Sequence, residues 1–173
     1  MKCHKTIIPA NSLTQKYLPV DYTDAFACEV TNTKKLSADE MMIVFWTAMP
    51  GWANALFKLR NVLVRPFGLV TEEGKDYVEE LKEMIHTGSG SAGLMSVTAK
   101  SDNETVVFLS DKHLDVYMSV FVEEEGRLQT ATAITLVRYH NRLGKIYFSL
   151  IGLFHKVIVK STLKNTLRRI VYL

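Results

Sequence analysis

The second half of the chain is dominated by short stretches in which apolar and polar residues alternate. A period of two is typical of β-strands with one buried face. The turns between these stretches are short and consist of polar residues and Gly, so successive strands must be antiparallel neighbours. The pattern predicts four strands, at residues 94–100, 104–109, 113–123 and 127–139. The last two are long for a small domain, which favours a curved sheet.

The N-terminal part of the chain combines a strand pattern with a helix start. Residues 21–31 alternate and predict a further strand, whereas residues 1–20 show no clear period and predict an arm docked on the domain. Ser37 and Glu40 have the spacing of a capping box, in which each side chain satisfies a backbone N–H group at a helix start. The helix that they open is expected to run to about Ala48.

The middle of the chain is harder to assign. Pro50 suits the first turn of a second helix, which would end near Pro66 and carry Trp52 on its apolar face. Residues 71–85 fit a short helix, with an edge strand or a loop as alternatives. The Gly- and Ser-rich residues 87–93 predict a flexible loop at the lip of the domain.

The C-terminal segment has a helical period from residue 145 to about 169. Its expected apolar face, packed against the sheet, comprises Ile146, Leu150, Leu153, Phe154, Val157 and Ile158. A basic stripe on another face repeats every four residues, at Lys156, Lys160, Lys164 and Arg168. On this assignment a charged residue in place of Leu150 should unfold the protein.

Four stretches carry a resemblance to a known family. They are Phe45-Trp46-Thr47-Ala48-Met49-Pro50-Gly51-Trp52 with Leu59-Arg60-Asn61, Asp111-Lys112-His113-Leu114-Asp115, His140-Asn141-Arg142-Leu143-Gly144-Lys145-Ile146-Tyr147-Phe148, and Leu153-Phe154-His155-Lys156-Val157-Ile158-Val159. In these stretches, and in its order of elements, the chain resembles a bacterial family known only as a domain of unknown function, number 2867 of that series. The family is placed in the START-like (SRPBCC) helix-grip superfamily. The likeness covers about residues 20–170.

The resemblance implies an α+β fold in which a curved antiparallel sheet wraps around a long C-terminal helix. It also implies a cavity between sheet and helix for a lipid-like or other apolar molecule, and no catalytic residues can be carried over. Some relatives look fused to NAD(P)-binding dehydrogenase-like domains, which suggests an NAD(P)-dependent oxidoreductase as a partner. This chain has no Gly-rich dinucleotide motif of its own. Leu153 stands where the family has a proline, which predicts a straighter helix.

Composition narrows the class of protein. The 173 residues suit one domain, expected to span residues 1–173. Net charge is +3, but all 18 acidic residues lie before residue 126, so residues 126–173 carry +9 and residues 1–125 carry −6. We favour a solvated helix face as the explanation, with an anionic membrane or acidic partner as the alternative and no role for nucleic acid. The apolar stretch 146–159 is too short to span a membrane.

Two cysteines, Cys3 and Cys28, are a poor basis for a disulfide framework. We interpret both as reduced thiols in a cytoplasmic protein. His113, His140 and His155 would form a metal site only if the fold gathered them, and their spacing gives no reason to expect it. No metal or other cofactor is therefore expected.

Candidate catalytic residues are His113, Asp115 and His155. His113 and Asp115 share one face of a strand with Tyr117 and Ser119, and this polar row either faces solvent, which we favour, or lines the cavity as an acid–base pair. His155 would be a hydrogen-bonded core residue or a donor or base in the cavity.

Candidate ligand-binding residues are aromatic, apart from one cation: Trp46, Trp52, Arg60, Tyr117, Tyr147 and Phe154. Arg60 would bind a ligand carboxylate or pair with an internal carboxylate such as Asp111. At the start of the last helix, Asn141 has the type and position of an N-cap.

The leading hypothesis is a protein that binds a small apolar ligand; a cofactor-free enzyme of cyclase or isomerase type and a basic-surface interaction protein are the alternatives. The oligomeric state stays open.

Overall fold

The computed structural model describes residues 1–31, 35–47, 51–52 and 77–172. The predicted helix from Pro50 to Pro66 therefore lies outside the described residues except for Gly51 and Trp52, and so does Arg60. The first part of the predicted segment 71–85, up to residue 76, also lies outside them.

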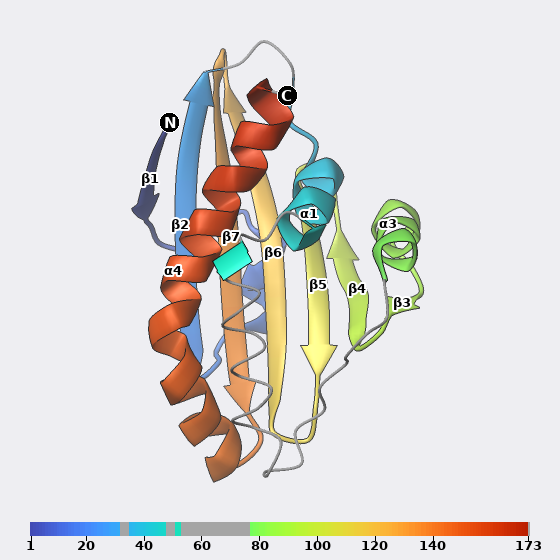
Figure 1. Cartoon of the computed structure of the whole chain (residues 1–173), viewed down its shortest axis with the longest axis vertical. Coiled ribbons are helices and arrows are strands. Elements are labelled where there is room, and N and C mark those ends of the chain that lie inside the picture. The colour runs from blue at the N-terminus through green and yellow to red at the C-terminus, as the bar shows by residue number, and fades with distance from the viewer. Residues whose placement is uncertain (32–34, 48–50, 53–76, 173) are drawn as a thin grey trace.

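The fold is α+β and is built on a seven-stranded antiparallel sheet (Figure 1). Along the sheet the order is β1-β2-β7-β6-β5-β4-β3. The strands from β3 to β7 form a meander, and β2 and β1 from the N-terminal part of the chain extend the sheet beyond β7. The strands are β1 (Lys2–Lys5), β2 (Tyr22–Thr31), β3 (Ser91–Ala92), β4 (Met95–Lys100), β5 (Glu104–Ser110), β6 (Leu114–Glu125) and β7 (Leu128–Tyr139). The four strands predicted in the second half of the chain and the one predicted at 21–31 are confirmed, with ends that differ by two residues at most.

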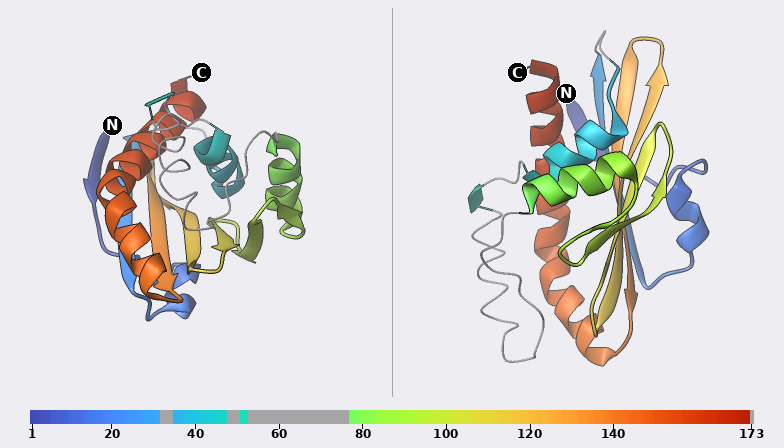
Figure 2. Two further views of the ribbon diagram at one scale, coloured as in Figure 1. Left: turned by 60° about the horizontal axis from the view of Figure 1, so that its bottom comes forward. Right: turned by 90° about the vertical axis from the view of Figure 1, so that its right-hand side faces the viewer.

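The long helices cover one face of the sheet. They are α1 (Ala38–Thr47), α3 (Val78–Thr87) and α4 (Arg142–Tyr172), while the short 3-10 helix η1 (Leu13–Tyr17) lies on the opposite face (Figure 2, right). The sequence predicted α1 and the cap by Ser37, whose Oγ accepts the Glu40 N–H at 3.4 Å. Of the alternatives for residues 71–85, the helix is confirmed from Val78 onward.

Alternation along the strands places the core. On the helix face of β7, Ala131 and Ala133 are buried and small, so α4 can lie close above them. Opposite them, β2 contributes Phe26 and Cys28 in the same register. On the other face of β7, Ile134 and Leu136 belong to a second core.

The N-terminal arm has more structure than its sequence predicts. Residues 2–5 form the edge strand β1, which pairs with β2 from Lys2 opposite Glu29 to Lys5 opposite Phe26. The chain then crosses to the far face, where η1 covers the second core and Tyr17 stacks on Tyr117 with ring centroids 4.2 Å apart. The loop predicted at 87–93 likewise contains a short strand, β3.

The assignment of Cys3 and Cys28 as reduced thiols is wrong. They face each other across β1 and β2 and form a disulfide, with Cα atoms 4.2 Å apart and a sequence separation of 25. The sequence assignment failed because it considered the number of cysteines and not their register. Neighbouring antiparallel strands place side chains from distant positions directly opposite each other.

The prediction of which side of the C-terminal helix is buried is also wrong for the residues up to Val157. Ile146, Leu150, Phe154 and Val157 are exposed on α4, and the side chain of Leu153 lies outside the described part of the structure. The side chains that α4 buries are instead Tyr147, Phe148, Val159, Thr162, Leu163, Thr166 and Leu167. Both sets have helical spacing, so period alone does not distinguish them.

Helix α4 is bent rather than straight. Its halves, Arg142–Gly152 and Phe154–Tyr172, meet at 56°, although Leu153 replaces the proline of the family. Gly152 stands at the bend, and a glycine there weakens the helix without removing a backbone hydrogen bond. Within the described ranges, no single helix is long and apolar enough to cross a membrane. The two halves of α4 reach the necessary length and apolar composition only when they are taken together across the bend.

Candidate functional site

A pocket of about 410 Å³ lies beside α4, over the strands β4, β5 and β6. From α1 come Phe45 and Trp46, and from α4 come Tyr147, Phe148, Ile151, His155, Ile158, Val159 and Thr162. The strands and the loops next to them contribute Leu94, Met95, Leu109, Ser110, Asp111, Leu114, Val116 and Met118. A pocket of this size, with mostly apolar walls and few polar groups, is typical of sites for small molecules.

Five of the described lining residues are polar or titratable, namely Ser110, Asp111, Tyr147, His155 and Thr162, and the first two hold structural hydrogen bonds. Ser110 Oγ donates to Asp115 Oδ1 at 2.7 Å. Asp111 Oδ1 accepts the backbone N–H groups of His113 and Leu114, at 2.6 and 3.0 Å. Of the other lining residues, Trp46 Nε1 and Thr162 Oγ1 are buried without a hydrogen-bond partner in the described part of the structure, and His155 contacts the sheet through one ring nitrogen only.

His155 belongs to a polar cluster between α4 and the sheet. Its Nε2 atom lies 3.2 Å from Thr135 Oγ1 and 3.6 Å from Asp24 Oδ2. Tyr22 Oη donates to the same Asp24 oxygen at 2.5 Å. Because these contacts use Nε2, Nδ1 is the imidazole nitrogen left to interact with a molecule in the pocket.

The register of two strands assembles this cluster. Asp24 on β2 is directly opposite Thr135 on β7, so their side chains lie on the same face of the sheet, beneath α4. Two aromatic rings enclose the imidazole: Phe148 with ring centroids 5.7 Å apart and Tyr22 at 6.3 Å. The polar groups are thereby held in an apolar setting.

The electrostatics of the cluster favour an ionised Asp24 beside a protonated Tyr22. Burial by itself raises the pKa of the Asp24 carboxyl, but the hydrogen bond and charge of His155, with hydrogen bonds from Tyr22 and Thr135, bring that pKa below its ordinary value. Burial and the Asp24 carboxylate raise the pKa of the Tyr22 hydroxyl. Asp24 Oδ1 has no hydrogen-bond partner among the described residues, so this oxygen can accept a further hydrogen bond.

Asp24 was not among the candidates from sequence, although the sequence contains a signal for it. It stands in the row Tyr22, Asp24, Phe26 and Cys28 of a predicted strand, where a charge interrupts residues expected to face the core. A buried charge on an apolar strand face needs a partner, so such a position deserves to be treated as a candidate site.

The candidate ligand-binding residues fall in different places. Trp46 and Tyr147 line the pocket, as does the candidate base His155. Phe154 points away from it, on the exposed side of α4, and Trp52 is 44% exposed. Tyr117 lies on the opposite face of the sheet, stacked on Tyr17.

The polar row on β6 does not line the pocket. The apolar row Val116, Met118 and Val120 faces the helices, which turns Tyr117 and Ser119 to the far face. That face is not fully exposed to solvent, because the N-terminal arm covers part of it and Ser119 is buried there. Asp115 forms an ion pair with His140 at 3.0 Å, and the hydrogen bond to Asp115 raises the pKa of His140.

His113 belongs to a structural corner where β7 turns into α4. Its backbone carbonyl accepts the His140 N–H at 2.8 Å, and its Nδ1 lies 3.2 Å from Asn141 Oδ1. Asn141 Oδ1 also accepts the Gly144 N–H at 3.0 Å, which confirms the predicted N-cap. These contacts account for His113 without a catalytic role.

A buried carboxylate on the far face fixes the N-terminal arm. Glu104 is almost completely buried and accepts hydrogen bonds from Ser12 Oγ at 2.8 Å, from the Leu13 N–H at 2.5 Å and from Ser119 Oγ. No pattern in the sequence singles out Glu104, because its partners come from a segment without a period. These bonds tie the N-terminal arm to β5 and β6, which gives Glu104 a structural role.

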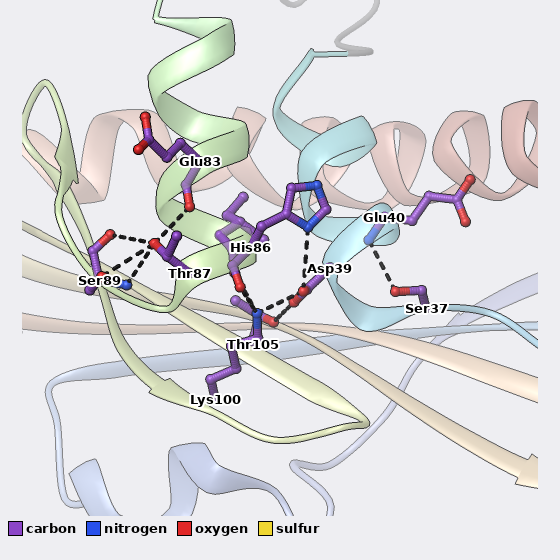
Figure 3. Close-up of polar contacts among 10 residues, drawn as sticks. Ser37, Asp39, Glu40, Glu83, His86, Thr87, Ser89, Lys100 and Thr105 are labelled. Carbon is purple, nitrogen blue, oxygen red and sulfur yellow. Dashed lines mark hydrogen bonds and ion pairs between the residues drawn. The ribbon is translucent and has the colours of Figure 1, made fainter.

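A second polar cluster joins α1, α3 and the sheet (Figure 3). Asp39 in the first turn of α1 accepts Lys100 Nζ at 2.7 Å and Thr105 Oγ1 at 2.8 Å. Lys100 Nζ also donates to the carbonyls of Ile85 and His86, at 2.5 and 3.0 Å, and so satisfies the C-terminal end of α3. All three Lys100 protons are used, which leaves no donor for a ligand. In the part of the chain that the structure describes, no group of three His, Cys, Asp or Glu side chains is placed to hold a metal ion.

Comparison with known proteins gives one finding about the family and none about the reaction. No curated protein matches the chain. A family model described as a protein of unknown function (DUF2867) matches residues 17–162. That range includes all the strands from β3 to β7, the Asp24–His155 cluster and every described residue that lines the pocket. The chain therefore belongs to the DUF2867 family of proteins of unknown function.

Proposed function

We propose that this protein binds a small, lipid-like apolar molecule in the pocket beside α4, in the manner of the helix-grip proteins of the START-like superfamily. The observation that carries the proposal is the pocket of about 410 Å³, whose walls are apolar except for a few side chains. The strand order supports it as well, because β2 and β7 are neighbours and α4 follows β7 directly. His155 is the group that orients the polar end of the ligand.

Native mass spectrometry of freshly purified protein, with denaturing extraction of whatever is bound, tests whether the pocket arrives occupied. The emptied protein is then titrated with the fluorescent apolar probe N-phenyl-1-naphthylamine. We expect saturable binding. Val116→Trp, which fills the pocket from β6, should weaken binding of the probe at least about tenfold.

Leu128→Trp is the matched control, because Leu128 is 40% exposed and does not line the pocket. It should leave probe binding unchanged, and both variants should keep a cooperative thermal transition. If the wild type carries no adduct and does not bind the probe, the proposal is wrong. Equal binding of the probe by the wild type and Val116→Trp would also contradict it.

A second candidate function, proton transfer within a bound substrate, is favoured by the Asp24–His155 geometry. Asp24 and Thr135 contact Nε2, so Nδ1 is the ring nitrogen that would act as a general base in the pocket. In an isomerisation, Nδ1 takes a proton from a carbon next to a carbonyl, and the C–H electron pair forms an enolate. The same proton then returns to a different carbon, so no oxidant or cofactor is needed.

The ring opening of 5-nitrobenzisoxazole reports on such a base, since removal of one C–H proton breaks the N–O bond and releases a coloured phenolate. We expect His155→Gln to lower the rate roughly a hundredfold and Asp24→Asn to change its pH profile. If the wild type is no faster than His155→Gln while still binding the naphthylamine probe, the protein is a binder and not this kind of enzyme.

A further inference from the structure

The surface of α4 that faces away from the sheet carries a continuous row of exposed apolar side chains. Here called the apolar stripe, it consists of Leu143, Ile146, Leu150, Phe154 and Val157, each between 45% and 66% exposed. Intervals of three and four residues keep Leu143, Ile146 and Leu150 on one side of the first half of α4, and Phe154 and Val157 share a side of the second half, beyond the bend. Single exposed apolar residues are ordinary on a protein surface, whereas a row of five large ones is typical of an interaction surface.

Cations run along one flank of the apolar stripe. Arg142, Lys145, Lys156 and Lys160 are all exposed on α4. At about 100° per residue, Arg142 and Lys160 lie about 40° from the edge of the stripe, and Lys145 and Lys156 lie further round, where the last turns of α4 bury Leu163 and Leu167. No acidic residue occurs between residue 126 and the end of the sequence, so nothing on this segment offsets their charge. The apolar row and the cationic flank therefore form one amphipathic surface.

Charge complementarity decides what fits this surface. A second copy of the chain packed stripe to stripe would bring two sets of these cations together, with no acid on either α4 to compensate. A bilayer that contains anionic lipids offers both components at the right depths, because hydrocarbon takes up the apolar side chains and headgroup phosphates attract Lys and Arg. The exposed amphipathic face of α4 thus matches a helix lying in the plane of a membrane.

We propose that α4 docks the protein on an anionic phospholipid surface, with the apolar stripe inserted between headgroups and the cationic flank on the phosphates. Docking uses the outer side of α4, whereas Tyr147, Phe148 and His155 on its inner sides stay with the pocket and the sheet. The proposal does not depend on ligand binding in the pocket. Figure 1 shows α4 in front of β2 and β7, with α1 and α3 over the other end of the sheet, so the outer side of α4 faces away from the strands.

Sedimentation with phospholipid vesicles tests this docking. We expect the full chain to pellet with vesicles of phosphatidylcholine and phosphatidylglycerol, and to be released by high salt. Leu150→Glu should lower the partition coefficient at least about tenfold, since it places a charge in the centre of the apolar stripe. Leu128→Glu, a control at an exposed apolar residue on β7, should bind like the wild type.

Three results would overturn the proposal. The first is absence of binding to anionic vesicles at low salt, and the second is equal binding to pure phosphatidylcholine. The third concerns what covers the stripe in solution. Leu150→Glu should leave Tm unchanged, so a marked fall in Tm, or a dimer that dissociates on this substitution, would show that Leu150 is covered by protein and not by lipid.

Discussion

At the scale of single residues, histidines that look alike in the sequence have different tasks. His113 and His140 hold the corner between β7 and α4, while His155 faces the pocket with Asp24 behind it. The sequence predicted His155 as a cavity residue or a core residue, and its position at the pocket wall combines both. It could not identify Asp24 as the partner, because the two are 131 positions apart in the numbering and meet only through the packing of α4 on β2.

The pair of Asp115 and His140 predicts a pH dependence. The hydrogen bond to Asp115 raises the pKa of His140 above 6.5, its ordinary value. A pKa raised in the folded state contributes stability that is fully present below the unfolded pKa and is lost as pH rises through the folded pKa. The pair should therefore stabilise the protein at acidic pH and add nothing at alkaline pH. The effect is small, since the His140 side chain is partly exposed.

NMR titration of the His140 ring protons checks this directly. In Asp115→Asn the pKa of His140 should fall toward 6.5. The chemical shifts of the His155 ring protons at one fixed pH should be unaffected, because His155 contacts Asp24 and Thr135 on another part of the sheet. An unchanged pKa of His140 in the variant would mean that the ion pair does not form in solution.

At the scale of elements, the strands were the easier part to predict. Successive side chains of each strand in the meander point to opposite faces of the sheet, and only one face carries the helices, so a period of two runs along the strands. Helix α4 is different, because its first half carries large apolar residues both on the buried side, such as Phe148, and on the exposed side, such as Leu150. A period of 3.6 is satisfied by either set. Only the contact between α4 and β7 decides which side is buried.

Two glycines of α4 give a sharp test of this packing. A Cβ atom on Gly144 would lie 2.1 Å from the backbone carbonyl oxygen of His113, and neither backbone can move freely at that corner. Gly144→Ala should therefore cost about 3 kcal/mol of stability or more. A Cβ on Gly152 meets nothing closer than 3.7 Å, from Phe148. Gly152→Ala should be neutral or gain up to about 1 kcal/mol from helix propensity.

Chemical denaturation of the two variants gives both values under the same conditions. Since each substitution adds the same methyl group to the same helix, a difference between them reports the surroundings and not the alanine. Equal stabilities for the two variants would contradict the approach of α4 to the His113 backbone.

At the scale of the whole molecule, the N-terminal arm is what most extends the fold beyond the prediction from sequence. It adds β1 to one edge of the sheet and then covers the far face with η1, where Glu104 binds Ser12 and the Leu13 backbone. The Cys3–Cys28 disulfide fixes the start of this path to β2. Both faces of the sheet are therefore covered, which a single strand pattern with one buried face does not predict.

Removal of the disulfide should lower stability measurably. Closing a loop with a sequence separation of 25 residues restricts the unfolded chain, for a gain of about 3 kcal/mol. For a chain of this length, Cys3→Ser or reduction by dithiothreitol should lower Tm by roughly 10 °C. Cys3 is the better position to change, because Cys28 is completely buried and a serine there would add a buried hydroxyl.

Thiol titration of the denatured, unreduced protein is the control for this prediction. It should detect no reactive thiol, since the structure contains no free cysteine among the described residues and both cysteines are described. Two reactive thiols, or a Tm that dithiothreitol leaves unchanged, would restore the interpretation of Cys3 and Cys28 as reduced.

The sequence by itself determined the strands of the meander, the capped helix after β2, the Asn141 cap and the long C-terminal helix. Each of these features follows from local periodicity or from the chemistry of a helix end. Local periodicity and helix-end chemistry do not depend on distant residues. The tertiary structure decided which side of α4 is buried, that Cys3 meets Cys28, and that Asp24 stands behind His155 at the pocket. These are pairings between distant segments, fixed by strand register and by the packing of α4 on the sheet, and no local pattern contains them.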